Sequence, residues 1–290
     1  RKYDNIDSKT AEGSQLNNNG INSSPDFPKK KPVEFSNSAL ARYLGALFYL
    51  GEGNSDSARI EFAQLQAAFA ANANVYSNPF PKAVEDAQNV PNGKARLNII
   101  CFTGLSPVKE EQIDKQYFPF FQNMALQYPQ FKLPILVKRP CRIDRVEITV
   151  ENEKFNLELL EDMGAVIAET YNARFSRVFI KTYIRTMLKY AAIDIAAAEA
   201  LRRAESDIIV VVAAASALAA KGVFDATESA DIRMSRYLPG KAYIGGINLD
   251  PGNHDVRIHF YAGTQLIAQE ERNVNVRADR LNLIEAVSLK

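Results

Sequence analysis

The sequence is poor in the residues that build metal sites and covalent catalytic centres. It has two cysteines, two histidines and no tryptophan in 290 residues. His254 and His259 lie five residues apart in an expected strand, so they are predicted to point to opposite faces and not to share a metal. There is no Cys/His cluster, glycine-rich nucleotide loop or Gly-x-Ser-x-Gly motif, which argues against metal-dependent, nucleotide-dependent and serine-hydrolase chemistry. We therefore expect no catalytic residues, no metal and no cofactor.

The chain also lacks an excess of charge and a long apolar run. Its 35 basic and 34 acidic residues predict no general attraction to nucleic acid or to a membrane surface. The charge-free run from Ile208 to Ala220 is bounded by Asp207 and Lys221 and is shorter than the roughly 20 residues that a membrane span needs. We interpret the run as a buried core helix in a soluble, globular protein.

The cysteine count leaves two interpretations open. Cys101 and Cys141 fit a reducing compartment, where each packs as a small hydrophobic side chain, and they also fit a single disulfide. A count of free thiols in denaturant, with and without reductant, distinguishes the two.

The N-terminal part of the chain predicts a linker followed by a helical region. Residues 1–37 are rich in Asn, Ser, Pro and Lys and are expected to be irregular. Residues 38–90 predict two amphipathic helices joined by a glycine turn. Within them, Tyr49, Gly53, Ala58 and Phe62 occur at the intervals of a tetratricopeptide unit, although an ordinary helical hairpin is the alternative. A solitary repeat must stack on neighbouring helices or on the next domain.

Residues 91–290 predict a β-rich domain with an inserted helical pair at 155–237. The insertion includes Leu157 and Leu160, and its first long helix repeats Ile180, Ile184 and Leu188 with the period of a helix that buries a broad face. The expected strands are Ala95–Thr103, Phe131–Val137, Arg145–Val150, Ala242–Leu249, His254–Tyr261, Gln265–Val276 and Arg280–Leu289. The segment Tyr117–Tyr128 is rich in aromatic residues. The short connections after Pro239 predict an antiparallel meander in one sheet of a sandwich.

The predicted fold class is therefore α+β. It comprises an N-terminal tetratricopeptide-like helical hairpin and a mostly antiparallel sheet or sandwich domain that carries the long helical pair.

One candidate binding segment is the loop expected after the first strand, with Gly104, Pro107, Lys109 and Glu110. Gly and Pro mark a tight loop at a strand end, which is a usual place for binding groups, although a plain turn has the same composition. The loop does not have the glycine pattern of a phosphate cradle.

A second candidate is a row of positive charges, Lys181, Arg185 and Lys189, at helical spacing. Like charges at this spacing repel each other. Three interpretations stay open: a solvated face, ion pairs with acids such as Glu228 and Asp231, and an anion site.

Arg233 and Arg236 precede Pro239, where the helical region gives way to strands. A guanidinium can donate to several carbonyl or carboxylate groups, so we expect these two arginines to tie the end of the second helix to the sheet.

Three motifs in order resemble a family of uncharacterised bacterial lipoproteins. They are Gly104-Leu105-Ser106-Pro107-Val108-Lys109-Glu110, the pattern Arg-x-x-x-Lys-Tyr at Arg185, Lys189 and Tyr190, and the segment Ala230-Asp231-Ile232-Arg233 that ends in Leu238-Pro239. The resemblance covers residue 38 to the C-terminus. It departs at Ser235, where the family pattern has a tryptophan. It implies further tetratricopeptide-like repeats and a lipid anchor upstream of this chain, and a periplasmic, outer-membrane-anchored location.

The expected function is that of a non-enzymatic scaffold or protein-interaction lipoprotein of the cell envelope. A protein partner is expected on the tetratricopeptide-like helices, because stacked helical repeats offer a concave surface. No nucleic acid is expected, and contact with the membrane is expected only through the upstream anchor. The alternative is a protein that binds a small or anionic ligand with residues 104–110 and the basic row.

Overall fold

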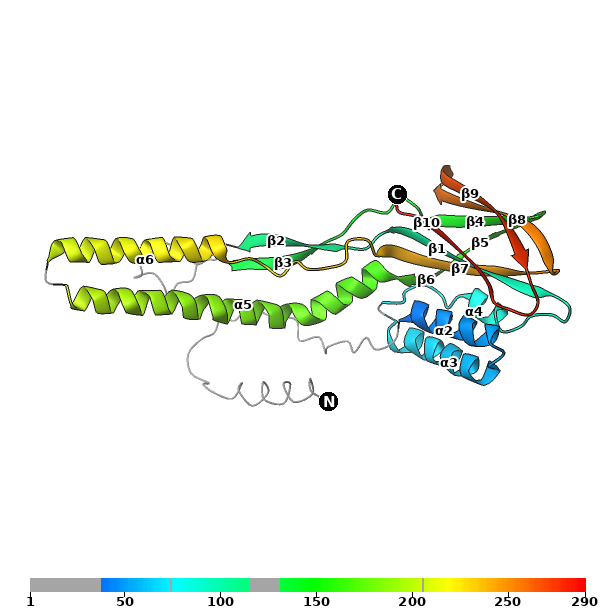
Figure 1. Cartoon of the computed structure of the whole chain (residues 1–290), viewed down its shortest axis with the longest axis horizontal. Helices are drawn as coiled ribbons and strands as arrows, with labels where there is room; N and C mark the ends of the chain where they lie inside the picture. Colours follow the sequence, from blue (N-terminus) through cyan, green and yellow to red (C-terminus); the bar gives the residue numbers. More distant parts are fainter. Residues whose placement is uncertain (1–37, 74, 115–130, 205) are drawn as a thin grey trace. The chain divides into compact units, whose positions relative to one another are not determined.

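The computed structural model describes residues 38–73, 75–114, 131–204 and 206–290 (Figure 1). It contains both helices and sheets, which confirms the α+β class. The predicted linker at 1–37 and the aromatic segment Tyr117–Tyr128 lie outside the described residues. The helices are α2 (Ala39–Gly51), α3 (Ser55–Ala71), α4 (Lys82–Asp86), α5 (Met163–Arg202) and α6 (Asp207–Thr227). The strands are β1 (Ala95–Leu105), β2 (Val108–Asp114), β3 (Phe131–Val137), β4 (Arg145–Val150), β5 (Glu153–Asn156), β6 (Glu158–Asp162), β7 (Pro239–Leu249), β8 (Gly252–Ala262), β9 (Gln265–Val276) and β10 (Asn282–Ser288).

The strands form two four-stranded sheets and one two-stranded ribbon. The first sheet has the order β10-β1-β7-β6, the second has the order β5-β4-β8-β9, and β2 pairs with β3. Only the β1–β10 pair is parallel among the described strands. The last four strands therefore do not form the predicted meander, since β7 and β10 belong to one sheet and β8 and β9 to the other. The sequence could not show this, because strand pairing depends on partners that are far apart in the chain.

One hydrophobic core lies between the two larger sheets. Alternate residues of each strand point into it, as the period of two requires. The first sheet contributes Leu97, Ile99, Cys101, Tyr243, Ile284 and Ala286, and the second contributes Val146, Ile148, Val150, Val256, Ile258 and Phe260. Cys101 is thus a buried core residue, and both cysteines are free thiols in the structure. Burial raises the pKa of the Cys101 thiol, so it stays protonated.

The helices α2, α3 and α4 cover the other face of the first sheet. Ile100 and Ile244 point from this face into a second apolar cluster, where they meet Tyr43, Leu47 and Phe62. The predicted glycine turn between α2 and α3 is present, because Gly53 has a φ of +73° and Asn54 caps α3. Helix α2 and the first sheet thus bury each other's apolar side chains.

Two carboxylates on β6 hold the beginnings of α2 and α4. Glu161 is buried and accepts hydrogen bonds from Ser38 Oγ at 2.8 Å and from the Leu40 backbone N–H at 2.7 Å. Glu158 accepts from the Ala83 backbone N–H at 2.7 Å. A negative charge at a helix N-terminus satisfies free N–H groups and interacts favourably with the helix dipole. The helical region is therefore anchored to the sheet by specific polar contacts as well as by apolar packing.

The helical insertion is shorter at both ends than the predicted 155–237. Leu157 and Leu160 are buried against the sheets, immediately before β6 and within it, and α5 begins only at Met163, capped by Asp162. At the other end, α6 stops at Thr227, so Arg233 and Arg236 follow the helix in an irregular segment. Leucines three residues apart fit either a helix or a short strand with a bulge, and here the pairing of β6 with β7, which has an irregularity at this point, selects the strand.

The two long helices do not bury the apolar residues that the sequence assigned to a core. On α5, Ile180, Ile184, Leu188 and Ile195 are exposed. Within the described residues, α6 is the one helix long and apolar enough to cross a membrane. Only 6% of its most apolar 18-residue stretch is buried. The prediction of a buried core helix is therefore wrong. The helix continues past the charge-free run through Lys221 to Thr227.

Candidate functional site

The predicted loop with Gly104, Pro107, Lys109 and Glu110 is mostly strand. β1 continues to Leu105 and β2 begins at Val108, so Lys109 and Glu110 lie in the β2–β3 ribbon. Gly104 has a φ of +60° and packs against Cys141, where a Cβ would stand 2.5 Å from the Cys141 Cβ. The glycine therefore allows the end of β1 to approach Cys141 closely.

Lys109 and Asp231 line one cavity of about 440 Å³ between α5 and the β2–β3 ribbon. Its walls are mainly apolar and include Leu136, Val166 and Ile167. Hydrogen bonds from Arg233 hold the pKa of the Asp231 carboxyl at about 2, with a further contribution from the Lys109 charge. The structure thus brings two of the sequence motifs together at the rim of a groove. Glu110 is exposed outside it.

Arg233 and Arg236 do not have the predicted role of tying the helix end to the sheet. The Arg233 side chain is 90% exposed and pairs with Asp231, two residues away. Arg236 contributes only its backbone carbonyl, which accepts from Arg139 Nη2 at 2.8 Å. Arg139 also donates from Nε to the Ser106 carbonyl at 2.6 Å. Arg139 is therefore the arginine that joins carbonyls of two segments, the role predicted for Arg233 and Arg236.

Two of the three positive charges in the row on α5 are paired with an acid beyond α6, which was one of the three interpretations, and the third, Lys181, is exposed. Arg185 and Lys189 both contact the Glu228 carboxylate, and the Lys189 contact measures 3.1 Å. Lys132 on β3 donates to the Glu228 backbone carbonyl at 2.7 Å. Asp231, also named as a partner, pairs with Arg233 instead. Glu228 therefore gathers cations from two elements at the base of the α5–α6 hairpin.

Polar side chains also lie between the two helices of this hairpin. Lys221 on α6 forms an ion pair with Asp194 on α5, and the Tyr190 hydroxyl donates to Asp225 Oδ1 at 2.7 Å. Lys221 and Asp225 are the only residues of α6 classed as buried. Spaced four apart, they lie on one face with Ala213 and Ala217, the partly buried small residues nearer the tip.

The outer surface of the hairpin is apolar. The five consecutive residues from Ile208 to Val212 are each between 40% and 76% exposed. Successive residues are separated by about 100° on a helix, so five in a row project in every direction around it. Figure 1 shows α6 alongside α5 and away from the two sheets' shared core. Between the charged residues at its base and its tip, α6 therefore turns Lys221 and Asp225 toward α5 and aliphatic side chains outward, the reverse of a water-soluble helix pair.

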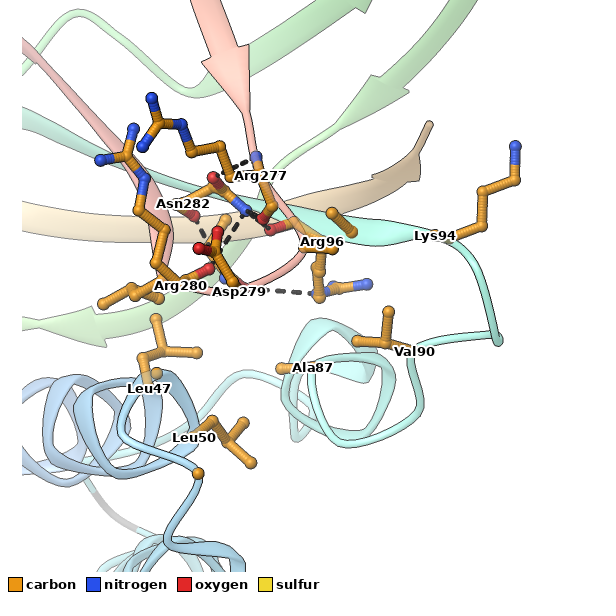
Figure 2. Close-up of a pocket in the computed structure, with 16 residues that line it drawn as sticks. Leu47, Leu50, Ala87, Val90, Lys94, Arg96, Arg277, Asp279, Arg280 and Asn282 are labelled. Atoms are coloured by element: carbon orange, nitrogen blue, oxygen red, sulfur yellow. Dashed lines mark hydrogen bonds between the residues drawn. The ribbon is translucent and has the colours of Figure 1, made fainter. Parts of the chain in front are cut away.

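A separate cavity of about 320 Å³ lies where α2, α4, β1 and the β9–β10 turn meet (Figure 2). Leu47, Leu50, Ala87 and Val90 form its apolar side. Lys94, Arg277, Asp279 and Arg280 lie around it, and Asn282 braces the turn by donating to the Arg277 carbonyl at 2.8 Å. The cavity is small, but it is within the lower range of ligand pockets.

Arg96 is the unusual residue of this cavity. It is only 8% exposed, its Nε donates to Asn98 Oδ1 at 3.3 Å, and its buried Nη2 has no hydrogen-bond partner within the described ranges. Gly246 makes room for it, because a Cβ there would stand 3.1 Å from Nε and Nη2. Burial lowers the pKa of Arg96, and the nearby Asp86 charge opposes this in part.

The two histidines lie on opposite faces of β8. His254 Nδ1 lies 2.7 Å from Glu151 Oε1, and its Nε2 lies 2.8 Å from the Asp250 carbonyl. His259 occupies the other face of β8, as the odd spacing predicts. No group of three or more potential metal ligands occurs in the part of the chain that the structure describes.

Sequence reasoning missed Arg96 and the pair Asp194–Lys221. A signal existed for the pair, since Asp194 is an isolated charge in an alanine-rich stretch and Lys221 and Asp225 follow the charge-free run at helical spacing. Arg96 carried no such signal, because alternation places it on the side of β1 opposite the core without showing that helices cover that side.

No family model, curated protein or solved structure matches the chain.

Proposed function

We propose that the protein is a non-enzymatic scaffold of the bacterial cell envelope that acts by docking, with the two-sheet body as a support for the exposed α5–α6 hairpin. The observation that carries the proposal is the inverted polarity of the hairpin, because contiguous exposed aliphatic residues mark interaction surfaces. The periplasmic location and the upstream lipid anchor implied by the sequence motifs are part of the proposal.

The proposal retains a protein partner for α2 and α3. We take these helices as one tetratricopeptide-like unit and the two larger sheets as a sandwich that supports it. Phe48 on α2 and Ile60 on α3 are exposed although large and apolar, and a shallow groove between the helices includes Arg42, Gly45 and Glu61. These residues support a contact of modest area beside the stronger one on the hairpin.

The docking proposal is tested with isolated bacterial envelopes. The double substitution Val211→Asp and Val212→Asp is expected to reduce the envelope-bound fraction at least tenfold, because it places charges on the apolar surface of α6. Sedimentation of envelopes with purified protein measures the bound fraction. Leu266→Asp with Leu289→Asp, at exposed apolar residues outside the hairpin, is the matched control and should bind as the wild type does.

Two results would contradict the assignment to the hairpin. Equal binding by the Val211/Val212 variant and the wild type would exclude the hairpin as the docking surface. Loss of binding on Phe48→Asp alone would transfer the docking function to α2 and α3.

A second candidate function is the binding of an anionic small molecule in the Arg96 cavity. A buried guanidinium with an unpartnered N–H is costly, and a carboxylate or phosphate oxygen would accept from it with a charge-assisted hydrogen bond. At the rim, Arg277 and Arg280 favour the same ligand charge, while Asp279 opposes it and Lys94 is paired with Asp250 at 2.8 Å. We therefore propose Arg96, and not residues 104–110, for the anionic-ligand alternative.

Calorimetric titration with inorganic phosphate tests this candidate. The wild type should bind phosphate, and Arg96→Gln should abolish the heat of binding. Arg280→Gln, at the exposed rim, should weaken binding less than tenfold because its charge is screened by solvent. Arg96→Lys serves as a second variant that keeps the charge and loses the planar fork. Absence of any binding by the wild type, or equal binding by Arg96→Gln, would exclude the candidate.

A further inference from the structure

We propose that the α5–α6 hairpin inserts into the hydrocarbon core of a lipid bilayer. The inference rests on the proposed docking function and names its target. It is carried by the arrangement of side chains across the whole hairpin, and not by the composition of one helix.

The first support is where the hairpin keeps its charges. Lys221, Asp225 and Asp194 lie at the contact between the helices and are paired, while the residues facing outward on α6 are aliphatic. Ionisable residues within a membrane face the interior of a helical bundle and pair with one another, because hydrocarbon does not solvate a charge. Water would favour the opposite arrangement.

The second support is the length between two groups of charged residues. The basal belt consists of Arg185, Lys189 and Glu228, and the tip cluster consists of Arg202, Arg203 and Asp207. At a rise of 1.5 Å per residue, Lys189 and Arg202 are about 20 Å apart along α5, and Asp207 and Glu228 are about 32 Å apart along α6. A bilayer has a hydrocarbon core about 30 Å thick, so the span along α6 matches it.

The third support is that two hydroxyl groups of α6 find hydrogen-bond partners within their own helix, where hydrocarbon would offer none. Ser216 Oγ donates to the Val212 carbonyl of its own helix, as Thr227 Oγ1 does to the Val223 carbonyl near the base at 2.9 Å. Glu199 is paired with Arg203 at 2.7 Å and lies one turn from the tip. Small residues such as Ala213 and Ala217 at the helix contact allow the close approach that membrane helices use.

A bilayer fits this surface better than a second protein chain does. A protein partner needs one apolar stripe on a helix, whereas Ile208 to Val212 are exposed on successive residues around α6. Lipid chains solvate all outward directions at once. The basic residues of both belts add attraction to anionic headgroups, which gives the occupant a charge preference.

Flotation with protein-free vesicles of phosphatidylethanolamine and phosphatidylglycerol tests the inference. The wild-type chain should float with the vesicles and stay bound in about 1 M salt, since salt screens surface charge and does not reverse burial of apolar side chains. Val211→Asp with Val212→Asp should lower vesicle binding at least tenfold, and Leu266→Asp with Leu289→Asp should leave it unchanged. Circular dichroism of each variant checks that the fold is retained.

The outcomes separate this inference from the docking function. Binding to whole envelopes without flotation of vesicles would overturn bilayer insertion and leave docking intact. Analytical ultracentrifugation without lipid measures self-association. If the protein self-associates through Val211 and Val212 and does not float with vesicles, the surface belongs instead to a second copy of the chain. Release from vesicles by salt would reduce the interaction to adsorption at the headgroups and overturn insertion.

Discussion

Replacing Lys221 with methionine is expected to destabilise the contact between α5 and α6 by about 3 to 5 kcal/mol. If the free energy of the whole contact is smaller than this loss, α6 should detach from α5. The Lys221 and Asp194 side chains are only 8% and 15% exposed. The substitution leaves the Asp194 carboxylate without its counter-ion in a site that water scarcely reaches. Hydrogen exchange measures the result, because protection of the α6 amides should fall toward that of an isolated helix.

Two further variants show whether the cost comes from the unpaired charge. Lys189→Met on the same hairpin removes an exposed cation whose partner Glu228 still has Arg185, so it should cost less than about 1 kcal/mol. Lys221→Met combined with Asp194→Leu removes both charges and should restore most of the protection. Equal loss in Lys221→Met and Lys189→Met would show that the buried pair does not organise the hairpin.

Gly104→Ala is expected to lower the free energy of unfolding by about 2 to 5 kcal/mol. About 1 to 2 kcal/mol comes from an L residue in the left-handed region, since Gly104 has a φ of +60°. A further 1 to 3 kcal/mol, roughly, comes from overpacking, because the new Cβ would stand 2.5 Å from Cys141 Cβ and 2.6 Å from Cys141 Sγ. Denaturant unfolding measures the total.

Gly263→Ala separates the two causes. Gly263 has a φ of +58°, and nothing lies within 4 Å of the position that its Cβ would take. This control should therefore show the backbone cost alone. Adding Cys141→Gly to Gly104→Ala removes both clashing atoms and should recover part of the loss, although the larger freedom of a second glycine offsets some of the gain. If the two alanine variants lose the same free energy, the close approach to Cys141 has no energetic weight.

The comparison of sequence and structure is most informative at Lys221. In the sequence, this lysine ends a charge-free run that was interpreted as a buried core helix. In the structure, Lys221 lies within α6 and forms an ion pair with Asp194 on the neighbouring helix. The partner lies 27 residues away in sequence, so no local pattern identifies it. The same reason hides the Arg96 site, which depends on the helices that cover β1.

The sequence by itself determined seven of the ten described strands and which of their residues share a face, but it did not show β2, β5 or β6. Alternation of apolar residues placed β1, β3, β4, β8 and β9 nearly as observed, and the glycine at position 53 marked the turn between two helices. These features follow from local steric preference and from the periods of strand and helix, which need no distant partner.

Only the tertiary structure decided what each face meets. It paired β10 with β1 in parallel, carried β1 through Gly104 and turned the charges of α6 toward α5. A helical period shows that Ile208 and Val212 share a side of α6, but it does not show whether that side meets protein, water or lipid. The free energy of burying a face depends on the medium that surrounds it, and only the positions of the other elements define that medium.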